Sequence, residues 1–225
     1  MVKVITLLPT RGFVLTEVEN AIDLELATNR QIPIIIRTHD MALPLSRNWL
    51  VETALKQKYW THALLVDDDV ILPKGALKQM IDLKSDVAVM NYPMQVKIGG
   101  KACGVICKNK DGSIVLAGLG ATLVKRKVFE KISQPWFIGT QYKITRDEKG
   151  ELGFFAGQPD GKFTSSAGED TYFYLQCTKH KFEIKATKLK AIHCRVDQMI
   201  TIAHNDRYSK QHTITKLKKI ERALL

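Results

Sequence analysis

The chain has 225 residues, 45% of them hydrophobic, and its 34 Lys and Arg against 23 Asp and Glu give a formal net charge of +11. Such a chain can bury a full core, and its length suits a single domain. Its apolar runs are far shorter than the ~20 residues that span a bilayer, and its first residues lack a secretory signal, so we expect a cytoplasmic protein without a transmembrane segment. The excess charge favours a polyanionic neighbour, although simple solubility would also explain it.

In chain order, the first half alternates apolar runs with helical patterns. The apolar runs are continuous, which indicates strands buried on both faces, as in a parallel sheet covered by helices. We therefore predict an α/β fold with a mostly parallel central sheet flanked by helices, and with ligands bound at the carboxyl ends of the strands. The predicted strands are residues 2–8, 32–37, 62–66 and 86–90, and the predicted helices are 14–28, 46–56 and 73–83.

In the second half the pattern changes to short strand-like pieces broken by glycine, which predicts a smaller region of β-hairpins. The segment 138–167 carries many turn signals, and we expect a mobile loop or a hairpin there. A helix then begins at Gly168, and strand-like pieces follow at 182–184 and 190–194. The last segment, 201–225, is a basic amphipathic tail, because its apolar residues recur at helical spacing with Lys and Arg between them.

Three aspartates, Asp67, Asp68 and Asp69, directly follow the predicted strand 62–66. Carboxylates this close together repel one another unless a cation neutralises them, and hard oxygen ligands suit Mg²⁺ or Mn²⁺. In an extended backbone, residues two apart face the same side, so Asp67 and Asp69 can share one site while Asp68 points away. A solvated acidic turn before the next helix is the alternative, and the position at the carboxyl end of a strand favours a metal and phosphate site.

Two further residues could join this site. Asp170 precedes three apolar residues by three, four and seven positions, which places it on the inward face of a helix, in the first turn. An acid there can be a base in a cleft or a charge partner of the helix N-terminus. His193 ends a strand-like run, and an imidazole at that position can be structural or can ligate Mn²⁺.

Taken in order, the motifs of the chain resemble the GT-A superfamily of glycosyltransferases, and within it the family 2 type. No single motif is specific, but their order and spacing together are, and the match runs from about residue 2 to residue 195. The motifs are Pro9-Thr10-Arg11, Ser46-Arg47-Asn48 with Leu50-Val51 and Ala54-Leu55, Asp67-Asp68-Asp69, Gly118-x-Gly120 leading to Leu123-Val124-Lys125-Arg126, Gly168-Glu169-Asp170, and His193.

This resemblance implies a Rossmann-like GT-A domain that moves a sugar from a nucleotide donor, with a UDP-sugar as the expected co-substrate. The metal, Mn²⁺ or Mg²⁺, would be held by Asp67, Asp69 and His193. In inverting members an acid of the Glu-Asp pair takes the acceptor proton, which points to Asp170, with Glu169 as an alternative or an acceptor ligand. The nucleotide-sugar contacts would come from Pro9, Thr10, Arg11, Asp40, Arg47, Asp67 and Asp68.

The resemblance also divides the single domain into parts. Residues 1–94 would be the nucleotide-sugar-binding half, 95–200 the acceptor and catalytic half, and 201–225 the basic tail. The chain departs from family 2 in two places. Its second strand ends in Thr38-His39-Asp40 rather than in a pair of acids, and no Gln/Arg-x-x-Arg-Trp motif follows Glu169-Asp170.

Charge gives the only indication of the acceptor, and two hypotheses stand. Lysines and arginines cluster in 97–131 with few acids, as contacts with the phosphates of DNA would require. The basic tail could instead lie on an anionic membrane, next to a lipid-linked or cell-envelope glycan, or it could simply pack on the domain. A non-catalytic nucleotide-binding protein is a more distant alternative. A nucleotidyltransferase is disfavoured, because the loop 9–12 is too short for the Gly-rich first loop of that class.

Overall fold

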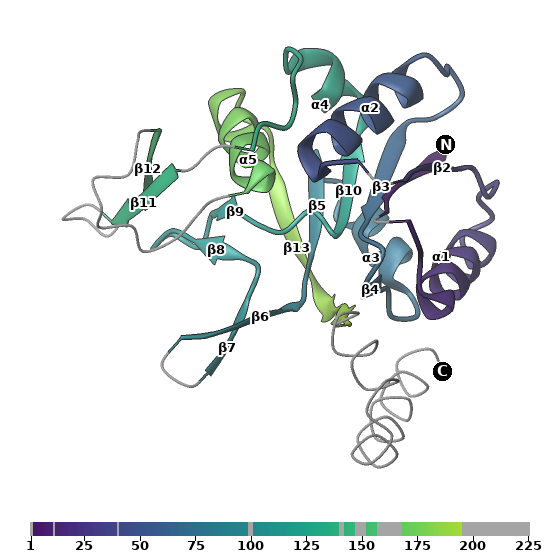
Figure 1. The fold of residues 1–225 in the computed structure, drawn as a ribbon, viewed down its shortest axis with the longest axis horizontal. Coiled ribbons are helices and arrows are strands. Elements are labelled where there is room, and N and C mark those ends of the chain that lie inside the picture. The colour runs from purple at the N-terminus through teal and green to yellow at the C-terminus, as the bar shows by residue number, and fades with distance from the viewer. Residues whose placement is uncertain are drawn as a thin grey trace.

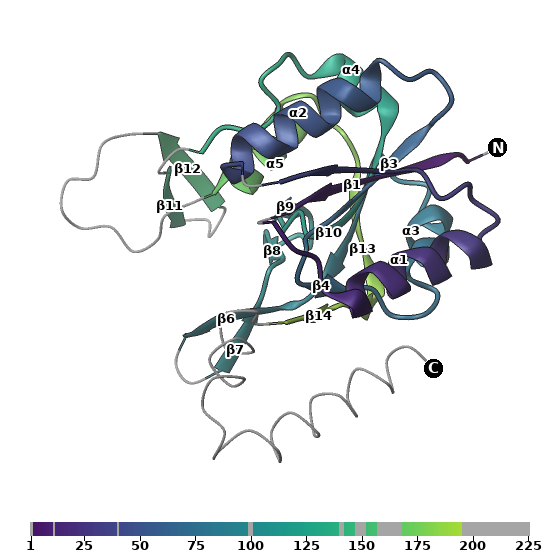
Figure 2. The ribbon, with the colours of Figure 1, turned by 45° about the vertical axis from the view of Figure 1, so that its right-hand side comes forward.

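A computed structural model describes residues 2–10, 12–39, 41–98, 101–139, 142–146, 152–156 and 168–194. These residues form three layers, in which helices cover both faces of a six-stranded sheet (Figures 1 and 2). The predicted α/β class with a mostly parallel sheet is confirmed, and the arrangement is consistent with a Rossmann-like GT-A fold. The helices are α1 (Thr16–Thr28), α2 (Leu43–Leu55), α3 (Ala76–Asp82), α4 (Arg126–Lys131) and α5 (Glu169–Lys179).

The central sheet has the strand order β13-β5-β10-β3-β1-β2, and of these six strands only β10 runs antiparallel to its neighbours. Because β2 and β3 lie on opposite sides of β1, the strand order reverses next to β1. Ligands of open α/β sheets bind at such a reversal, beside the carboxyl ends of the strands. The strands are β1 (Val4–Pro9), β2 (Ile35–Thr38), β3 (His62–Val66), β5 (Val87–Asn91), β10 (Ala121–Lys125) and β13 (Ile184–Lys190).

Four two-stranded sheets surround the central one. One of them joins β4 to β14, and each of the others pairs two consecutive strands as an antiparallel hairpin. The prediction of hairpins in the second half is confirmed, including a hairpin within 138–167. The strands are β4 (Val70–Ile71), β6 (Pro93–Ile98), β7 (Lys101–Gly104), β8 (Cys107–Lys108), β9 (Ile114–Leu116), β11 (Tyr142–Arg146), β12 (Leu152–Ala156) and β14 (Ile192–His193).

Two hydrophobic cores lie on opposite faces of the central sheet. Helices α1 and α3 pack on one face with Val4 and Leu8, and helices α2, α4 and α5 pack on the other with Ile5 and Leu7. Figure 2 shows the two groups of helices on either side of the strands. Since successive side chains of a strand point to opposite faces, a strand covered on both sides has no polar face. This is why β1 is apolar on both faces apart from Thr6, with every residue buried.

Some elements differ from their predicted bounds for local reasons. Helix α2 begins at Leu43 rather than at residue 46, because Pro44 has the fixed φ angle that a first helical turn requires. Strand β13 is continuous instead of two short pieces. It lies at the edge of the sheet, and three of its seven residues, all lysines, are exposed and interrupt the apolar run. Strand β10 and helix α4 carried no distinct pattern and were not predicted as elements.

Two predictions extend beyond the described residues. The basic tail, 201–225, lies outside them, so the tail and the one-domain assignment stay predictions. Within the described part, none of the helices has the length and apolar character needed to cross a bilayer.

A buried carboxylate joins the two helices on one face of the sheet. Glu25 of α1 is 1% exposed, and its two oxygens accept hydrogen bonds from the backbone N–H of Gly75 at 2.6 Å and of Leu77 at 2.7 Å. The first N–H groups of a helix have no partner within the helix, and a negative charge there also interacts favourably with the helix dipole. Glu25 therefore supplies the cap that α3 lacks locally.

We expect Glu25→Ala to lower the free energy of unfolding by about 2–3 kcal/mol, because two buried N–H groups lose a charged acceptor. Chemical denaturation of both proteins measures the difference. Asp23→Ala is the matched control, since Asp23 lies on the exposed face of the same helix, and it should change stability by less than about 0.5 kcal/mol. Equal losses from both variants would contradict the capping role.

Candidate functional site

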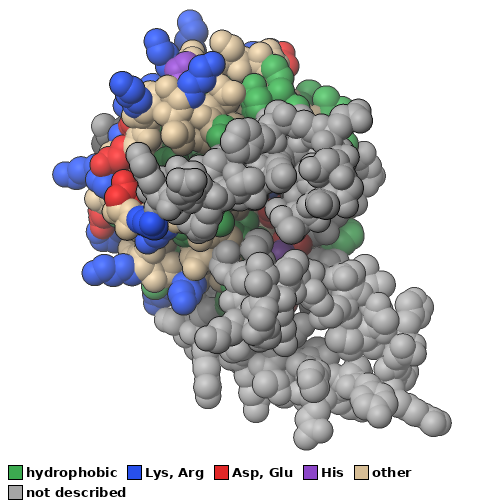
Figure 3. Space-filling model, turned by 90° about the vertical axis from the view of Figure 1, so that its left-hand side faces the viewer, with side chains coloured by type: hydrophobic (Ala, Val, Ile, Leu, Met, Phe, Trp, Pro, Cys, Tyr) green, Lys and Arg blue, Asp and Glu red, His purple; other side chains and the backbone are tan. Residues whose placement is uncertain are grey.

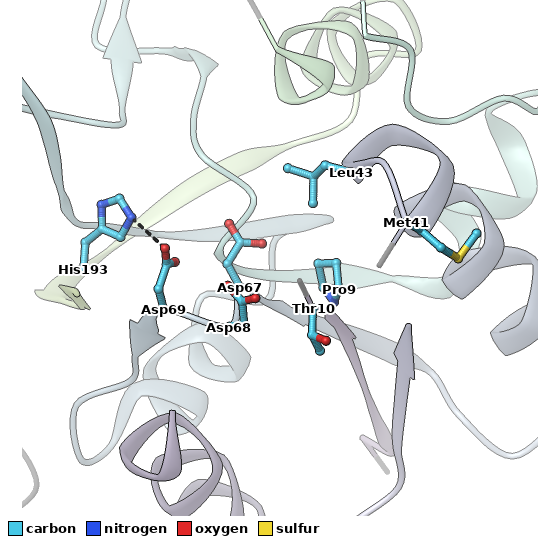
Figure 4. Close-up of a pocket in the computed structure, with 8 residues that line it drawn as sticks. All are labelled: Pro9, Thr10, Met41, Leu43, Asp67, Asp68, Asp69 and His193. Atoms are coloured by element: carbon cyan, nitrogen blue, oxygen red, sulfur yellow. Dashed lines mark ion pairs between the residues drawn. The ribbon is translucent and has the colours of Figure 1, made fainter. Parts of the chain in front are cut away.

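A pocket of about 380 Å³ opens where the carboxyl ends of β1 and β3 meet. Figure 4 shows the three aspartates in its middle, with His193 on one side and Pro9 and Thr10 on the other. Its volume is within the range of small-molecule sites, roughly 300–1,000 Å³. The pocket therefore lies at the carboxyl end of the strand that precedes the aspartates, which is the location predicted from the sequence. The lining residues are Pro9, Thr10, Met41, Leu43, Asp67, Asp68, Asp69 and His193.

The aspartate triplet forms a turn rather than an extension of β3. Strand β3 ends at Val66, and the N–H of Val70 donates to the carbonyl of Asp67 at 3.2 Å. The alternation expected of an extended strand therefore does not apply, and the expectation that Asp68 points away is wrong. Asp68 is 3% exposed and lines the pocket together with its two neighbours.

Asp69 faces His193 across the pocket. Strand β14 pairs with β4, placing His193 opposite Val70, and the N–H of Cys194 donates to the carbonyl of Asp69 at 2.7 Å. The imidazole Nε2 lies 3.6 Å from Asp69 Oδ2 (Figure 4). Two residues far apart in the sequence are thus brought together by backbone pairing.

A second contact orients the His193 ring. Its Nδ1 lies 3.2 Å from the carbonyl oxygen of Pro93, a distance at which a protonated Nδ1 donates a hydrogen bond. In the neutral ring this leaves the lone pair of Nε2 facing the Asp69 carboxylate. The interaction with Asp69 raises the pKa of His193, although burial opposes it. The space between Nε2 and the carboxylate therefore favours a proton or a metal cation.

The donor set fits a cation that keeps other ligands. Two atoms that each bind Mg²⁺ or Mn²⁺ at about 2.1 Å lie within about 4.2 Å of one another, and the 3.6 Å between Asp69 and His193 meets that limit. No group of three or more His, Cys, Asp or Glu side chains is placed to hold a metal within the described ranges. Such a two-residue site suits a metal whose shell is completed by substrate phosphates and water.

Asp67 turns toward a buried arginine instead of toward His193. Arg47 of α2 is 2% exposed, and its Nη2 lies 2.6 Å from Asp67 Oδ1, while its Nη1 forms an ion pair with Glu169 Oε1. Burial on its own lowers the pKa of Arg47, but the charges of Asp67 and Asp170 more than offset this and raise it. Burial raises the pKa of Asp67, and Arg47 opposes the rise. Arg47, predicted as a nucleotide contact, is not among the pocket-lining residues.

Two glycines make room for Asp67 and for Tyr92. A Cβ added to Gly120 would lie 2.6 Å from Asp67 Oδ2 and 2.8 Å from the Tyr92 hydroxyl oxygen, and one added to Gly118 would lie 2.2 Å from the same hydroxyl. The N–H of Gly120 donates to that hydroxyl at 3.1 Å. Burial raises the pKa of Tyr92, and the charges of Asp67 and Asp170 add to the rise, so the phenol stays protonated. Tyr92 also packs edge-on against His193.

The acid pair lies in the first turn of α5, as predicted. Phe173, Tyr174 and Cys177 are fully buried, which confirms the inward face, and Asp170 at the same face is partly exposed. Its Oδ1 lies close enough to Gly168 that an added Cβ would be 3.1 Å away. Glu169 is the buried member of the pair and bonds to Arg47.

Several predicted or lining residues remain to be placed. Arg11 and Asp40 lie outside the described residues. Met41 and Leu43 line the pocket but were not predicted, although they follow β2 and the strand-end rule could have indicated them. Tyr92 was also missed as a site residue, and it follows β5 in the same way.

Comparison with known proteins shows that the chain shares a fold with solved structures, but it does not assign the chain to a family. No family model matches the chain, and neither does any curated protein. One similar solved structure is A197 from STIV, at 20% identity over 87% of this chain and 86% of that chain, with a TM-score of 0.56. A likeness at this identity shows a shared fold only.

A second structure is more distant. It is a glycosyltransferase involved in the glycosylation of the major capsid of PBCV-1, at 12% identity over 60% of this chain and 69% of that chain, with a TM-score of 0.36. A likeness at this score carries no argument about activity, which has to rest on the residues of the site.

We expect Gly120→Ala to lower the free energy of unfolding by about 1–3 kcal/mol, because the new methyl group overpacks Asp67 and Tyr92. Thermal and chemical denaturation measure the loss. Adding Tyr92→Phe removes one of the two clashing oxygens, so the double variant should lose less than the sum of the two single variants. If the stability losses of the two single variants simply add in the double variant, or if Gly120→Ala is as stable as the wild type, the close approach of Gly120 to Asp67 and Tyr92 is not the cause.

Proposed function

We propose that the protein is a divalent-metal-dependent glycosyltransferase that moves a sugar from a nucleotide donor to an acceptor hydroxyl. The observation that carries the proposal is the set of three aspartates and His193 around one pocket at the reversal point of an α/β sheet. An acidic wall repels a bare phosphate but suits a diphosphate that binds together with a divalent cation. The order of motifs that resembles the GT-A superfamily supports the same reading.

Asp69 and His193 would hold Mn²⁺ or Mg²⁺, which when bound would neutralise the charge that develops on the departing diphosphate. The contact of Nδ1 with Pro93 presents Nε2 to that position, as is usual for metal-binding histidines. Asp67 adds negative charge nearby, but its Oδ1 is already bonded to Arg47. We therefore propose that Asp67 contributes negative charge to the site and contacts the donor ribose. The principal metal ligands would be Asp69 and His193.

The opposite side of the pocket suits a nucleoside. Pro9, Met41 and Leu43 offer apolar surface, and Thr10 offers a polar group. The Thr10 hydroxyl accepts a hydrogen bond from the N–H of Gly12 at 3.1 Å and lies 3.4 Å from His39 Nδ1. A mostly apolar wall with a few fixed polar groups is typical of small-molecule sites. We propose a UDP-sugar as the donor.

Asp170 is the base that we propose for the acceptor. Glu169 is buried and bonded to Arg47, whereas Asp170 in the same turn keeps part of its side chain exposed. In the transfer the acceptor oxygen would attack the anomeric carbon as the bond to the diphosphate breaks, and the hydroxyl proton would pass to Asp170. A single displacement of this kind inverts the configuration of the sugar carbon.

The described surface gives the DNA hypothesis limited support. Lys125 and Lys127 both bond to Asp86, at 3.2 and 2.7 Å, and Arg126 bonds to Glu130 at 2.7 Å. In Figure 3 the Lys and Arg side chains of one face are spread over the surface, with Asp and Glu among them. Both acceptor classes stay proposals. Salt-sensitive retention on duplex DNA would favour DNA, and sedimentation with anionic vesicles would favour a membrane-associated glycan.

Nucleotide sugars and Mn²⁺ test the donor site directly. A UDP-sugar at one hundred times its Kd should raise the melting temperature by roughly 5 °C, and only when Mn²⁺ is present. Asp69→Asn should weaken Mn²⁺ binding at least about tenfold in a calorimetric titration, because it removes a charged ligand. Asp82→Asn, an exposed acid on α3, is the control. Unchanged Mn²⁺ affinity in Asp69→Asn would remove the metal assignment.

The base is tested separately from donor binding. Asp170→Asn should keep the stabilisation by donor and Mn²⁺ but lower the transfer rate by about 10²–10⁴-fold, the usual contribution of a general base. Glu130→Gln on α4, an exposed acid away from the pocket, should transfer at the wild-type rate. Retained turnover in Asp170→Asn would show that another group takes the proton.

A further inference from the structure

We propose that Arg47 is a positioning residue that ties the donor-site carboxylate Asp67 to Glu169, and so fixes the first turn of α5, which carries Asp170. The proposal rests on the proposed function for its consequence in transfer, and on the geometry for the positioning itself. It differs from the role that the sequence resemblance implies, in which Arg47 contacts the nucleotide.

The geometry of Arg47 suits two carboxylates from separate elements. One guanidinium nitrogen bonds to Asp67 at the end of β3, and the other bonds to Glu169 at the start of α5. The side chains of Arg47 and Glu169 are 2% and 9% exposed, so solvent screens this pair weakly. The planar guanidinium presents its donors in a fixed geometry that an ammonium lacks.

Stability alone does not account for this arrangement. Replacing a buried ion network by apolar residues of similar volume is often neutral or stabilising, because removing charges from water is costly. In addition, Arg47 Nε is buried without a hydrogen-bond partner among the described residues. Contact with two carboxylates therefore explains the burial of Arg47 better than a gain in stability does.

Another residue of α2 holds the body of α5 through a separate route. Asn48 donates to the carbonyl of Phe137 at 2.7 Å and accepts from the N–H of Trp136 at 2.9 Å, and Phe137 stacks on Phe173 with ring centroids 5.3 Å apart. The middle of α5 is thus anchored by packing. Loss of Arg47 should release the first turn and leave the rest of the helix in place.

Removing Arg47 also removes one positive charge beside the aspartates. The remaining carboxylates should then attract a divalent cation at least about tenfold more strongly, because even at the dielectric constant of water a unit charge a few ångströms away changes the affinity by about that much. An arginine that bound the nucleotide would give the opposite pattern, with weaker nucleotide binding. The two roles are therefore separable without measuring transfer.

The test compares Arg47→Met, Arg47→Lys and Glu169→Gln, with Arg126→Met as a control for the loss of an arginine elsewhere. Hydrogen exchange of the amides in 169–173 should become at least about tenfold faster in Arg47→Met and Glu169→Gln, and stay unchanged in α3. Mn²⁺ alone should bind at least about tenfold tighter to Arg47→Met, and Arg47→Lys should restore the wild-type affinity. With Mn²⁺ saturating both proteins, the affinity for UDP or GDP should change by less than about twofold.

Each outcome decides between the two roles. Wild-type exchange in 169–173, or a loss of more than about tenfold in nucleotide affinity for Arg47→Met, would overturn the positioning role. If Arg47→Met does not fold, Glu169→Gln decides, because it removes the charge of the contact with α5 and keeps the pair of Arg47 with Asp67. If the wild-type protein binds neither Mn²⁺ nor nucleotide, the proposed function fails, and hydrogen exchange still tests the positioning.

Discussion

Excess negative charge at one edge of the sheet is the constraint on which the rest of the site depends. Asp67, Asp68 and Asp69 crowd one turn, and the acids of α5 lie close enough for Asp170 to act on the charge of Arg47. Among the described residues, the buried guanidinium of Arg47 on α2 contacts Asp67, and the imidazole of His193 on β14 contacts Asp69. Carboxylates crowded in this way favour a bound cation, and the proposed function assigns a divalent metal to that place.

Much of the fold could be predicted because burial on both faces leaves a clear pattern. Strands β1, β3 and β5 are almost entirely buried, so each reads as a run of mostly apolar residues, and the helices between them follow the helical period. Strand β10 could not be placed in the same way. It enters the sheet between β3 and β5, and this long-range pairing has no local signal in the sequence.

Several residues that line the pocket were named from the sequence, but the contacts between the side chains were not. The strand-end rule located the aspartates and the pocket, and motif order added His193 and the acid pair. The division of labour within the triplet depends on a turn, which alternation does not describe. The pair of Arg47 with Glu169 joins residues far apart in the chain, and a pattern within one segment cannot reveal it.

The lysines of β13 bear on the meaning of the net charge. Lys185, Lys188 and Lys190 are exposed along a strand that forms one border of the central sheet. A bordering strand has unpaired backbone groups that can recruit a strand from another molecule, and a row of lysines discourages such contact by repulsion and by its need for water. Three of the 34 lysines and arginines thus lie on an exposed edge, where charged side chains are common in β-sheet proteins, and a polyanionic acceptor is not needed to explain them.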